Sequence, residues 1–371
     1  MKSEVQSDNE EKLPIIAVLV QVKGGDQSSP NFGNLHSFCI ELSLHAIDAG
    51  ILLYVFTLDG IADDGINGYR LENRQWAKEL LPYPDIVYNR LYSRKTETGK
   101  KFSKFLKLAA HQDIVIFNSH FLHKWEVHQL LSKHEGLESH LPETSLYSPE
   151  ALSRMMCSGK TVYLKPIHGS LGKKIIRLTS NEDNIIADFS AFPNEKERIF
   201  PTVKEAANIL PSLLGREIFI IQRGIPLITQ NGKPIDFRVL CHIDSSLIWK
   251  TTSIIARIAG EGDITSNLSR GGKTEKPIKV LLPLFGREKS TTIYNNMKKF
   301  AIAVSEIISE HCSGTFGELG VDIGVDVAGE IWLIETNSKP SKNFPMNDTR
   351  IRPSAKSIIE CSRGLYKKTR W

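Results

Sequence analysis

The first hydrophobic segments of the chain alternate between two patterns. Residues 15–20 form a short continuous apolar run, which is typical of a buried strand. Residues 34–48 carry apolar side chains at helical spacing, and Gly50 ends that pattern. Residues 51–56 are again a continuous apolar run. The order strand–helix–strand predicts a parallel sheet with a right-handed crossover, so we expect the chain to begin with an α/β domain.

Two further apolar runs, at residues 85–90 and 113–118, extend this predicted sheet. No G-x-G-x-x-G sequence follows the first strand, so the pattern lacks the fingerprint of a dinucleotide-binding domain. We place the first domain at residues 13–118. The polar residues 1–12 before it are expected to be disordered.

Beyond residue 118 the pattern favours strands joined by loops and occasional helices. Residues 120–134 have the spacing of an amphipathic helix, and Ser148 followed by Pro149 predicts the N-cap and first turn of another. The acidic and polar residues 180–210 are interpreted as a connection. Strands are predicted at residues 161–166, 174–178, 217–222, 236–241 and 248–258, and a helix at residues 290–311.

Residues 317–340 predict an antiparallel hairpin that carries a polar set. Asp322 lies on its first strand, and Glu335 and Asn337 end the second. Residues two apart in a strand face the same side, so Glu335 and Asn337 converge, and the hairpin can bring Asp322 beside them. Two carboxylates and an amide oxygen are ligands that Mg²⁺ accepts. Solvated acids at a hairpin end are the alternative. We favour a metal site, with Asp326 as a structural residue of the turn.

Composition bounds the class of protein. A chain of 371 residues with 41% hydrophobic and 24% charged residues is an ordinary globular protein of about two or three domains. No apolar run approaches ~18 residues, so no membrane span is expected, and the polar N-terminus argues against secretion. Five cysteines without a C-x-x-C pair favour a reducing compartment and argue against a zinc or disulfide framework.

The net charge of +5 is concentrated after residue 349. We interpret residues 350–371 as a basic C-terminal tail. Such a tail could favour an anionic surface, but a solvated tail is the preferred interpretation. The modest charge does not predict a nucleic-acid partner.

A glycine-containing loop follows the strand that ends near Lys165. Gly169, Ser170 and Gly172 would allow backbone N–H groups to close on phosphate oxygens, and Lys165 would add a positive charge. When such a loop is taken alone, a plain β-turn is the favoured interpretation. His168 beside it could be a general base, but we interpret it as a polar loop residue.

The order of these features resembles the ATP-grasp superfamily. The strand with Lys165 at its end comes first, and the G-S-x-G loop and an apolar strand that ends in Gln222 follow it. After them come Asp236-x-Arg238, a second arginine and the Asp…Glu-x-Asn set. The resemblance covers residues 119–340, and the leading part resembles the accessory N-terminal domain of that superfamily. It implies an α/β ATP-grasp fold with an N-terminal parallel-sheet domain. The ATP-grasp domain would span residues 119–349, with a lid lobe at 143–224 and a metal-site lobe at 225–349.

A narrower resemblance concerns one branch of the superfamily. The segments 84–90, 236–238 and 335–340 resemble YheC/YheD-type proteins, which are described as endospore coat-associated in spore-forming bacteria. This resemblance carries no assigned substrate. It implies a cytoplasmic location, in the mother cell or at the spore coat, with coat proteins as candidate partners.

The superfamily resemblance also implies roles for individual residues. Lys124 and Lys165 would contact the α- and β-phosphates under a lid at 169–172, and Gln222, Arg223 and Ile225 would form the hinge that reads adenine. An acidic residue is common in that hinge, but this chain has Gln222-Arg223-Gly224 there. The residue that would contact the ribose is therefore left open. Arg238 and Arg257 would stabilise the transferred phosphoryl group; Asn267, Ser269 and Gly271 would lie near the acceptor; and Asp322, Glu335 and Asn337 would bind metal. The alternatives are that Lys124 is an ordinary surface lysine and that the two arginines are ion-paired or snorkelling.

The predicted function is therefore that of an ATP-dependent carboxylate–amine or carboxylate–thiol ligase acting through an acyl phosphate. Its cofactors would be ATP and one or two Mg²⁺ ions, with Mn²⁺ as a substitute. The partners would be an unidentified carboxylate and an amine or thiol acceptor. The alternative is a non-catalytic, nucleotide-binding structural protein of the endospore coat.

Overall fold

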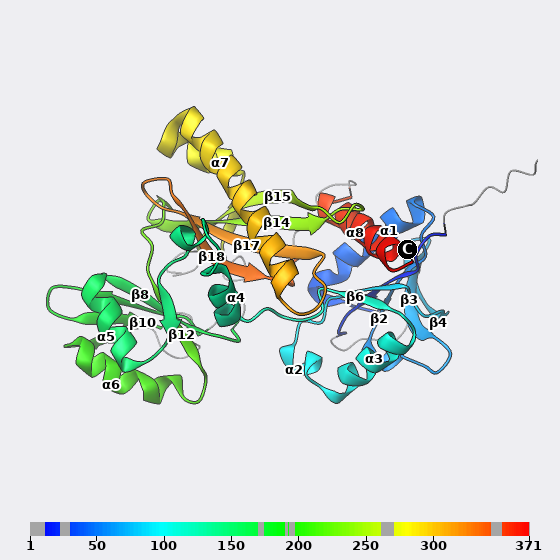
Figure 1. Ribbon diagram of the computed structural model, residues 1–371, viewed down its shortest axis with the longest axis horizontal. Helices are drawn as coiled ribbons and strands as arrows, with labels where there is room; N and C mark the ends of the chain where they lie inside the picture. Colours follow the sequence, from blue (N-terminus) through cyan, green and yellow to red (C-terminus); the bar gives the residue numbers. More distant parts are fainter. Residues whose placement is uncertain are drawn as a thin grey trace, which may run out of the picture.

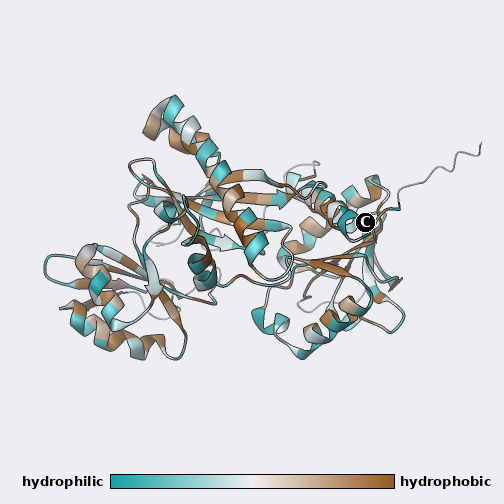
Figure 2. Cartoon of the chain, viewed as in Figure 1, coloured by the Kyte–Doolittle hydropathy of each residue, from teal (hydrophilic) through white to brown (hydrophobic). Residues whose placement is uncertain are grey.

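The computed structural model describes residues 12–22, 30–169, 174–189, 192, 197–260, 271–342 and 351–370. Within these ranges the chain forms three six-stranded sheets (Figure 1). Apolar residues concentrate in the sheets and on the helix faces turned toward them (Figure 2). The proposed domain boundaries remain predictions.

The first sheet has the order β4-β3-β2-β1-β5-β6. Its parallel part confirms the four strands predicted first: β1 (Ile16–Leu19), β2 (Leu53–Phe56), β5 (Ile86–Asn89) and β6 (Val115–Phe117). Helix α1 (His36–Asp48) joins β1 to β2, preceded by η1 (Gly33–Leu35). The apolar runs are continuous because β1, β2 and β5 are buried at every position.

An antiparallel hairpin of β3 (Ile66–Glu72) and β4 (Gln75–Leu81) adds to this sheet beside β2. It was not predicted, because most of its positions are polar or only partly buried, which leaves a weak alternation. The remaining elements of this part are η2 (Leu58–Gly60), α2 (Arg94–Glu97) and α3 (Lys100–His111). Helix α4 (Lys124–Leu131) and η3 (Glu138–His140) lead into the second sheet.

The second sheet, which we call the lid sheet, has the antiparallel order β11-β10-β9-β8-β12-β7. Its strands are β7 (Thr144–Leu146), β8 (Thr161–Pro166), β9 (Ile176–Ser180), β10 (Ile185–Asp188), β11 (Glu197–Phe200) and β12 (Phe219–Arg223). Helices α5 (Pro149–Ser158) and α6 (Val203–Leu214) pack on it and enclose a separate core. Ser148 caps α5 as predicted, since its side chain accepts a hydrogen bond from the Ala151 N–H.

The interpretation of residues 180–210 as a connection was wrong. They contain β10, β11 and most of α6. Thr202 caps α6, and Ala206, Ala207 and Leu210 bury its inner face. The polar residues between these elements hid the short apolar stretches, which become a core only when the sheet assembles around them.

The third sheet has the order β16-β15-β14-β17-β18, and β13 pairs with β14. Its strands are β13 (Thr229–Gln230), β14 (Lys233–Ile243), β15 (Trp249–Ile258), β16 (Lys273–Glu275), β17 (Glu318–Val325) and β18 (Ile331–Asn337). Strands β17 and β18 form the predicted hairpin. Helix α7 (Pro277–His311) packs on this sheet and begins earlier than predicted. Gly286 interrupts it with φ of 71° and ψ of 176°.

The interpretation of the C-terminal residues as a solvated tail was also wrong. Residues 353–370 form helix α8, which packs against α1, β14 and β15. Its buried face consists of residues at helical spacing, among them Ala355, Ile358, Ile359, Cys361 and Leu365. The basic side chains lie between these positions, so charge and core contacts share one amphipathic helix.

The first and third sheets share a continuous core that the lid sheet does not join. A buried carboxylate, Glu318 on β17, crosses their boundary. It accepts hydrogen bonds from Tyr88 (2.5 Å) and Arg90 (3.3 Å) on the first-sheet side, and it also pairs with His242 and Lys342. Burial would raise the pKa of Glu318, but the Lys342 charge, the His242 hydrogen bond and the Arg90 charge outweigh it and hold the pKa well below its usual range. The lid sheet is thus the separately packed part of the molecule.

Candidate functional site

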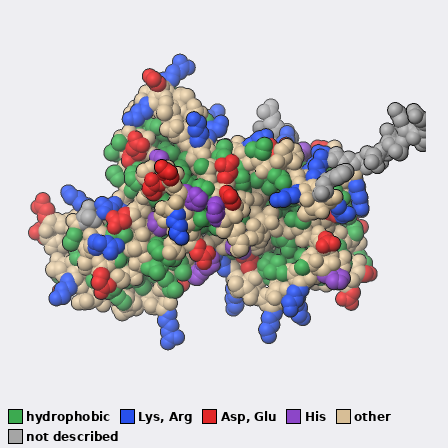
Figure 3. All heavy atoms as spheres, viewed as in Figure 1, with side chains coloured by type: hydrophobic (Ala, Val, Ile, Leu, Met, Phe, Trp, Pro, Cys, Tyr) green, Lys and Arg blue, Asp and Glu red, His purple; other side chains and the backbone are tan. Residues whose placement is uncertain are grey.

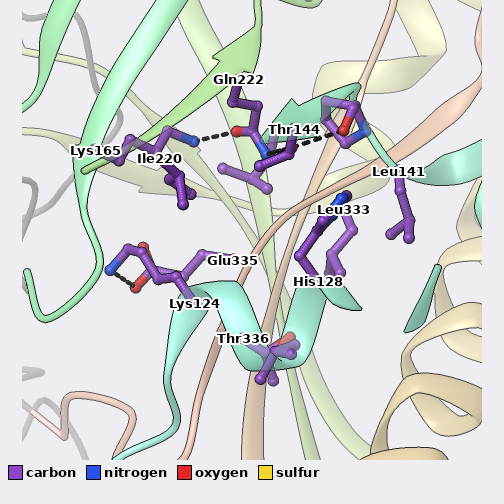
Figure 4. A pocket seen from close by; sticks show the side chains of 13 residues that line it. Lys124, His128, Leu141, Thr144, Lys165, Ile220, Gln222, Leu333, Glu335 and Thr336 are labelled. Carbon is purple, nitrogen blue, oxygen red and sulfur yellow. Dashed lines mark hydrogen bonds and ion pairs between the residues drawn. The ribbon is translucent and has the colours of Figure 1, made fainter. Parts of the chain in front are cut away.

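A hollow lies where the lid sheet faces the β17–β18 hairpin and helix α4 (Figure 4). One part of its wall is apolar and comes from Val127, Leu141, Ile220 and Leu333. The polar part includes Lys124, Thr144, Lys165, Gln222 and Glu335. An apolar wall beside two ammonium groups suits a ligand with one flat apolar portion and one anionic portion.

Lys165 reaches this hollow from β8. Its Nζ donates a hydrogen bond to Gln222 Oε1 on the neighbouring strand β12 at 2.5 Å, and Gln222 Nε2 donates to Thr144 Oγ1 on β7 at 3.0 Å (Figure 4). Burial lowers the pKa of Lys165 to about 8; the Lys124 ammonium adds to this lowering, and the Glu335 carboxylate opposes it. Lys165 is therefore a cation whose charge an anionic ligand would stabilise.

Lys124 connects the lid sheet to the hairpin. It is the first residue of α4, and its Nζ donates hydrogen bonds to the Gly169 carbonyl oxygen at 2.6 Å and to Glu335 Oε1 at 2.9 Å. Its side chain is only 13% exposed. The alternative interpretation, an ordinary surface lysine, is therefore wrong: Lys124 lies in the hollow between three elements.

The three predicted metal ligands lie on one face of the hairpin. Asp322 pairs directly with Glu335 across the ladder, and Asn337 pairs with Gly320 two residues earlier on β17. Directly opposed residues share a face, so the register brings the two carboxylates and the amide together. Asn337 Nδ2 donates to Asp322 Oδ2 at 3.3 Å, which leaves its amide oxygen available to another partner.

Asp322 also holds the two predicted phosphoryl-binding arginines. Arg238 Nη2 donates to Asp322 Oδ2 at 2.9 Å, with a second bond from its Nε to Oδ1, and Arg257 Nη2 lies 3.1 Å from Oδ2. Burial would raise the pKa of Asp322, but the two guanidinium groups outweigh it and lower the pKa. Asp322 is therefore ionised in the folded protein.

Arg257 is fixed between two carboxylates. Its Nε and Nη2 donate to the two oxygens of Asp236, each at 2.6 Å, and it also contacts Asp322. Burial disfavours its charge, but the Asp322 and Asp236 carboxylates outweigh that effect and raise its pKa. The paired-arginine interpretation thus describes the structure, while contacts of Arg238 and Arg257 with a phosphoryl group remain a prediction.

The donor set fits a magnesium ion in its chemistry. Asp322 and Glu335 are acids on one face of the hairpin, and Asn337 beside them supplies a hard amide oxygen; of the three, Glu335 lines the hollow. Within the described ranges there is no cluster of three or more His, Cys, Asp or Glu side chains with metal-binding geometry, so an Asn is needed to complete a triad. The present partners of the carboxylates are Lys124 and the two arginines.

Comparison with known proteins places this geometry in a family. The family model for YheC/D-like ATP-grasp proteins matches residues 113–365. The chain belongs to this family. It is 31% identical to the endospore coat-associated protein YheD of Bacillus subtilis (strain 168) over 313 residues, which are 82% of this chain and 67% of YheD. It is 22% identical to YheC of the same organism over 328 residues, 87% of this chain and 89% of YheC.

The fold is shared with a solved structure. The D-alanine-D-alanine ligase from Coxiella burnetii superposes with a TM-score of 0.52 at 13% identity, covering 97% of both chains. These comparisons confirm the predicted ATP-grasp fold and the predicted YheC/YheD-type family. At this identity the structural similarity concerns the fold alone.

Some predicted site residues of this YheC/D-like ATP-grasp protein do not line the hollow or cannot be placed. Ser170, Gly172, Asn267 and Ser269 lie outside the described residues. Gly271 is exposed, with φ of +88°. Arg223 forms an ion pair with Glu143, and neither Arg223 nor Ile225 is among the described residues that line the hollow. Their nucleotide contacts remain predictions.

Sequence reasoning missed part of the wall. Thr144 was not among the predicted site residues, although it lies on strand β7 and its hydroxyl accepts a hydrogen bond from Gln222. Asp236 was noted only as part of a motif, yet it is the bidentate partner of Arg257. Antiparallel pairing of the two predicted strands could have indicated this, because Arg257 lies opposite Asp236 in the β14–β15 register.

Asp326 has the structural role predicted for it. Its carboxylate accepts hydrogen bonds from the Ala328 N–H, the Glu330 N–H and Trp332 Nε1, each at 2.9 Å. These bonds close the β17–β18 turn. His168 packs edge-on against His123, with ring centroids 4.6 Å apart, so the loop histidine has an aromatic partner on the segment before α4.

Proposed function

We propose that this protein binds ATP in the hollow between the lid sheet and the β17–β18 hairpin and uses it to join a carboxylate to an amine or thiol. The observation that carries this proposal is the convergence of Lys124 and Lys165 with Glu335, from three separate elements, beside an apolar wall. A polyanionic ligand with a flat apolar base matches both parts of that hollow. Membership of an ATP-grasp family supports the same ligand.

In this proposal the apolar wall receives the adenine ring. Lys124 and Lys165 exchange their present partners, the Gly169 carbonyl, Glu335 and Gln222, for phosphate oxygens. Asp322, Glu335 and Asn337 would hold one or two Mg²⁺ ions; Mn²⁺ offers the same charge. Bound Mg²⁺ supplies charge neutralisation at the β- and γ-phosphates.

Arg238 and Arg257 would orient and neutralise the transferred group. Arg257 is pre-oriented by Asp236, so its guanidinium does not have to be ordered when the reaction begins. The γ-phosphoryl group passes to an oxygen of the substrate carboxylate, and ADP leaves. An amine or thiol then attacks the carbonyl carbon of the acyl phosphate, phosphate departs, and the proton of the nucleophile is released to solvent.

The second candidate is a nucleotide-binding structural protein of the endospore coat. The names of YheD and YheC, both endospore coat-associated proteins, favour it. Coat proteins would then be its partners, whether or not it turns over ATP. The convergence of Lys124, Lys165 and Glu335 at the hollow, with Asp322 and Asn337 on the same hairpin, makes the ligase our primary proposal.

Glu335→Gln tests the proposal, with Glu330→Gln in the same hairpin as its control. Glu335 faces the hollow, whereas Glu330 is exposed in the turn. We expect Glu335→Gln to reduce Mg²⁺-dependent phosphate release from ATP at least about 100-fold, because metal neutralisation of phosphate charge contributes several kcal/mol. The control should retain wild-type release, and both variants should melt within a few degrees of wild type.

The substrate screen pairs amino acids and small carboxylates with amine and thiol acceptors. Phosphate release that requires both a carboxylate and an acceptor supports the ligase. Thermal stabilisation by Mg²⁺ and ATP without release for any pair supports the structural candidate. Absence of any stabilisation by nucleotide contradicts both.

A further inference from the structure

The carboxylate of Asp322 is surrounded by hydrogen-bond donors. Its Oδ1 accepts a hydrogen bond from Arg238 Nε. Its Oδ2 accepts one from Arg238 Nη2 at 2.9 Å and one from Asn337 Nδ2 at 3.3 Å, and Arg257 Nη2 lies 3.1 Å from the same oxygen. These contacts match the roughly four lone-pair sites that a carboxylate offers. A divalent cation can therefore reach Asp322 only if one of the donors moves.

The two arginines on Asp322 are not equally free to move. Arg257 is also held by both oxygens of Asp236, each at 2.6 Å. Among the described residues, Asp322 is the ion-pair partner of Arg238, and no second carboxylate pairs with this arginine. Arg238 is therefore the arginine that can leave Asp322 without breaking another ion pair.

The register of the third sheet places Arg238 beside the metal-site face. Arg238 on β14 lies directly opposite Asp322 on β17, and Asp322 lies opposite Glu335 on β18. Neighbouring strands lie about 4.8 Å apart, so these three side chains form a row on one face of the sheet. Lys124 extends the row, since its Nζ donates to Glu335 Oε1 at 2.9 Å. Each carboxylate of the row thus has a protein cation as its partner.

Burial distinguishes the Arg238–Asp322 pair from an ordinary surface ion pair. Many Lys and Arg side chains project from the outline of the molecule, where water surrounds them (Figure 3). The side chain of Arg238 is only 13% exposed, and that of Asp322 is 7% exposed. Water and salt screen such a pair weakly. Its separation therefore requires a new cation for Asp322 and a new anion for Arg238.

We propose that Arg238 competes with a divalent cation for Asp322, and that a nucleotide phosphate decides this competition by binding Arg238. Arg238 then exchanges one anion for another, and no buried charge is left unpaired. Nucleotide and cation favour each other's binding, because each supplies the partner that the other one displaces. The release of Arg238 to phosphate rests on the proposed function, whereas the competition for Asp322 does not.

Binding of Mn²⁺ alone tests the competition. Electron paramagnetic resonance measures the free Mn²⁺ left by the full chain in the absence of nucleotide. We expect Arg238→Gln to bind Mn²⁺ at least about tenfold more tightly than wild type, the scale of one charge-assisted hydrogen bond. Arg238→Lys, which keeps the charge and serves if Arg238→Gln does not fold, should bind it at least about threefold more tightly, because an ammonium group lacks the planar fork that spans both oxygens.

Two double variants of equal net charge show where the cation binds. Arg238→Gln/Asp322→Asn should lose the gain in affinity, whereas Arg238→Gln/Glu330→Gln should keep it, since Glu330 is exposed in the turn. Arg177→Gln breaks the pair of Arg177 with Asp188 (3.0 Å) in the lid sheet and should bind Mn²⁺ like wild type. Equal affinity of wild type and the Arg238 variants would overturn the proposal. A gain that survives Asp322→Asn, or that Arg177→Gln also shows, would overturn it too.

The release of Arg238 is measured separately by NMR of ¹⁵N-labelled arginine side chains. The Arg238 Nε–H signal is assigned by its loss in Arg238→Lys. It should stay in place with Mg²⁺ alone and shift when a non-hydrolysable ATP analogue is added. A shift with Mg²⁺ alone, or no shift while the analogue raises the melting temperature, would refute the release. If the analogue does not stabilise the fold with Mg²⁺, the proposed function fails, and the Mn²⁺ measurements alone decide the competition for Asp322.

Discussion

The lowered pKa of Lys165 gives a quantitative test of the proposed phosphate contact. In the free protein, burial lowers this pKa to about 8. Phosphate oxygens stabilise the ammonium form, so binding should restore the pKa toward about 10.4, the value of an unperturbed lysine. Because the bound form holds the proton more tightly than the free form, nucleotide affinity must fall as pH rises through the free pKa.

The magnitude follows from those two values. Between pH 7 and pH 9 the affinity for Mg²⁺ and ATP should fall about tenfold, since at pH 9 only about one free molecule in ten carries the Lys165 charge. At pH 8.5 binding should take up about 0.7 proton per nucleotide. Below about pH 7 the Lys165 contribution should be nearly constant, because both free and bound forms are protonated.

Isothermal titration calorimetry in buffers of different ionisation enthalpy measures both quantities. Lys165→Arg is the control, because arginine keeps its charge across this range. It should show neither the loss of affinity nor the proton uptake, so subtracting its pH profile removes the titration of ATP and of other lysines. The same pH profile and proton uptake in wild type and Lys165→Arg would refute the contact between Lys165 and phosphate.

Two further predictions concern charged groups fixed by their neighbours. Arg257→Lys should leave nucleotide affinity within about threefold of wild type but reduce phosphate release at least about 100-fold, because lysine cannot bridge Asp236 and Asp322 with a planar fork; unchanged release would contradict the role of Arg257. Glu318→Gln should lower the free energy of unfolding in urea by about 3–5 kcal/mol, because Lys342 and Arg90 lose the charge of their buried partner. Glu217→Gln, which breaks the half-exposed pair with Lys174, should cost less than about 1 kcal/mol, and equal costs would contradict this account.

Local patterns in the sequence determined several of the strands and the β17–β18 hairpin. Continuous apolar runs identified β1, β2 and β5, because each is buried on both faces of a parallel sheet. Apolar residues in strand patterns on either side of a turn identified β17 and β18. Because residues two apart in a strand face the same side, Glu335 and Asn337 could be placed together. These features depend on near neighbours in the chain, so they are readable without the fold.

The tertiary structure decided the partners of the charged residues. Lys124 meets Gly169 and Glu335, which are 45 and 211 residues away, and no local pattern encodes such contacts. The same holds for Glu318, whose partner Arg90 is 228 residues away, directly after strand β5 of the first sheet. Charged residues look alike in sequence whether they are solvated or buried, and only packing settles which of them lose water and need a counter-charge.

The C-terminal helix α8 also shows the difference between what the sequence predicts and what only the assembled fold decides. Its basic composition favoured a solvated tail, although the apolar residues of α8 already stood at helical spacing. Spacing alone cannot show that a surface exists to receive an apolar face. Helix α1 and strands β14 and β15 provide that surface, because the first and third sheets meet there, and their meeting is a property of the assembled fold.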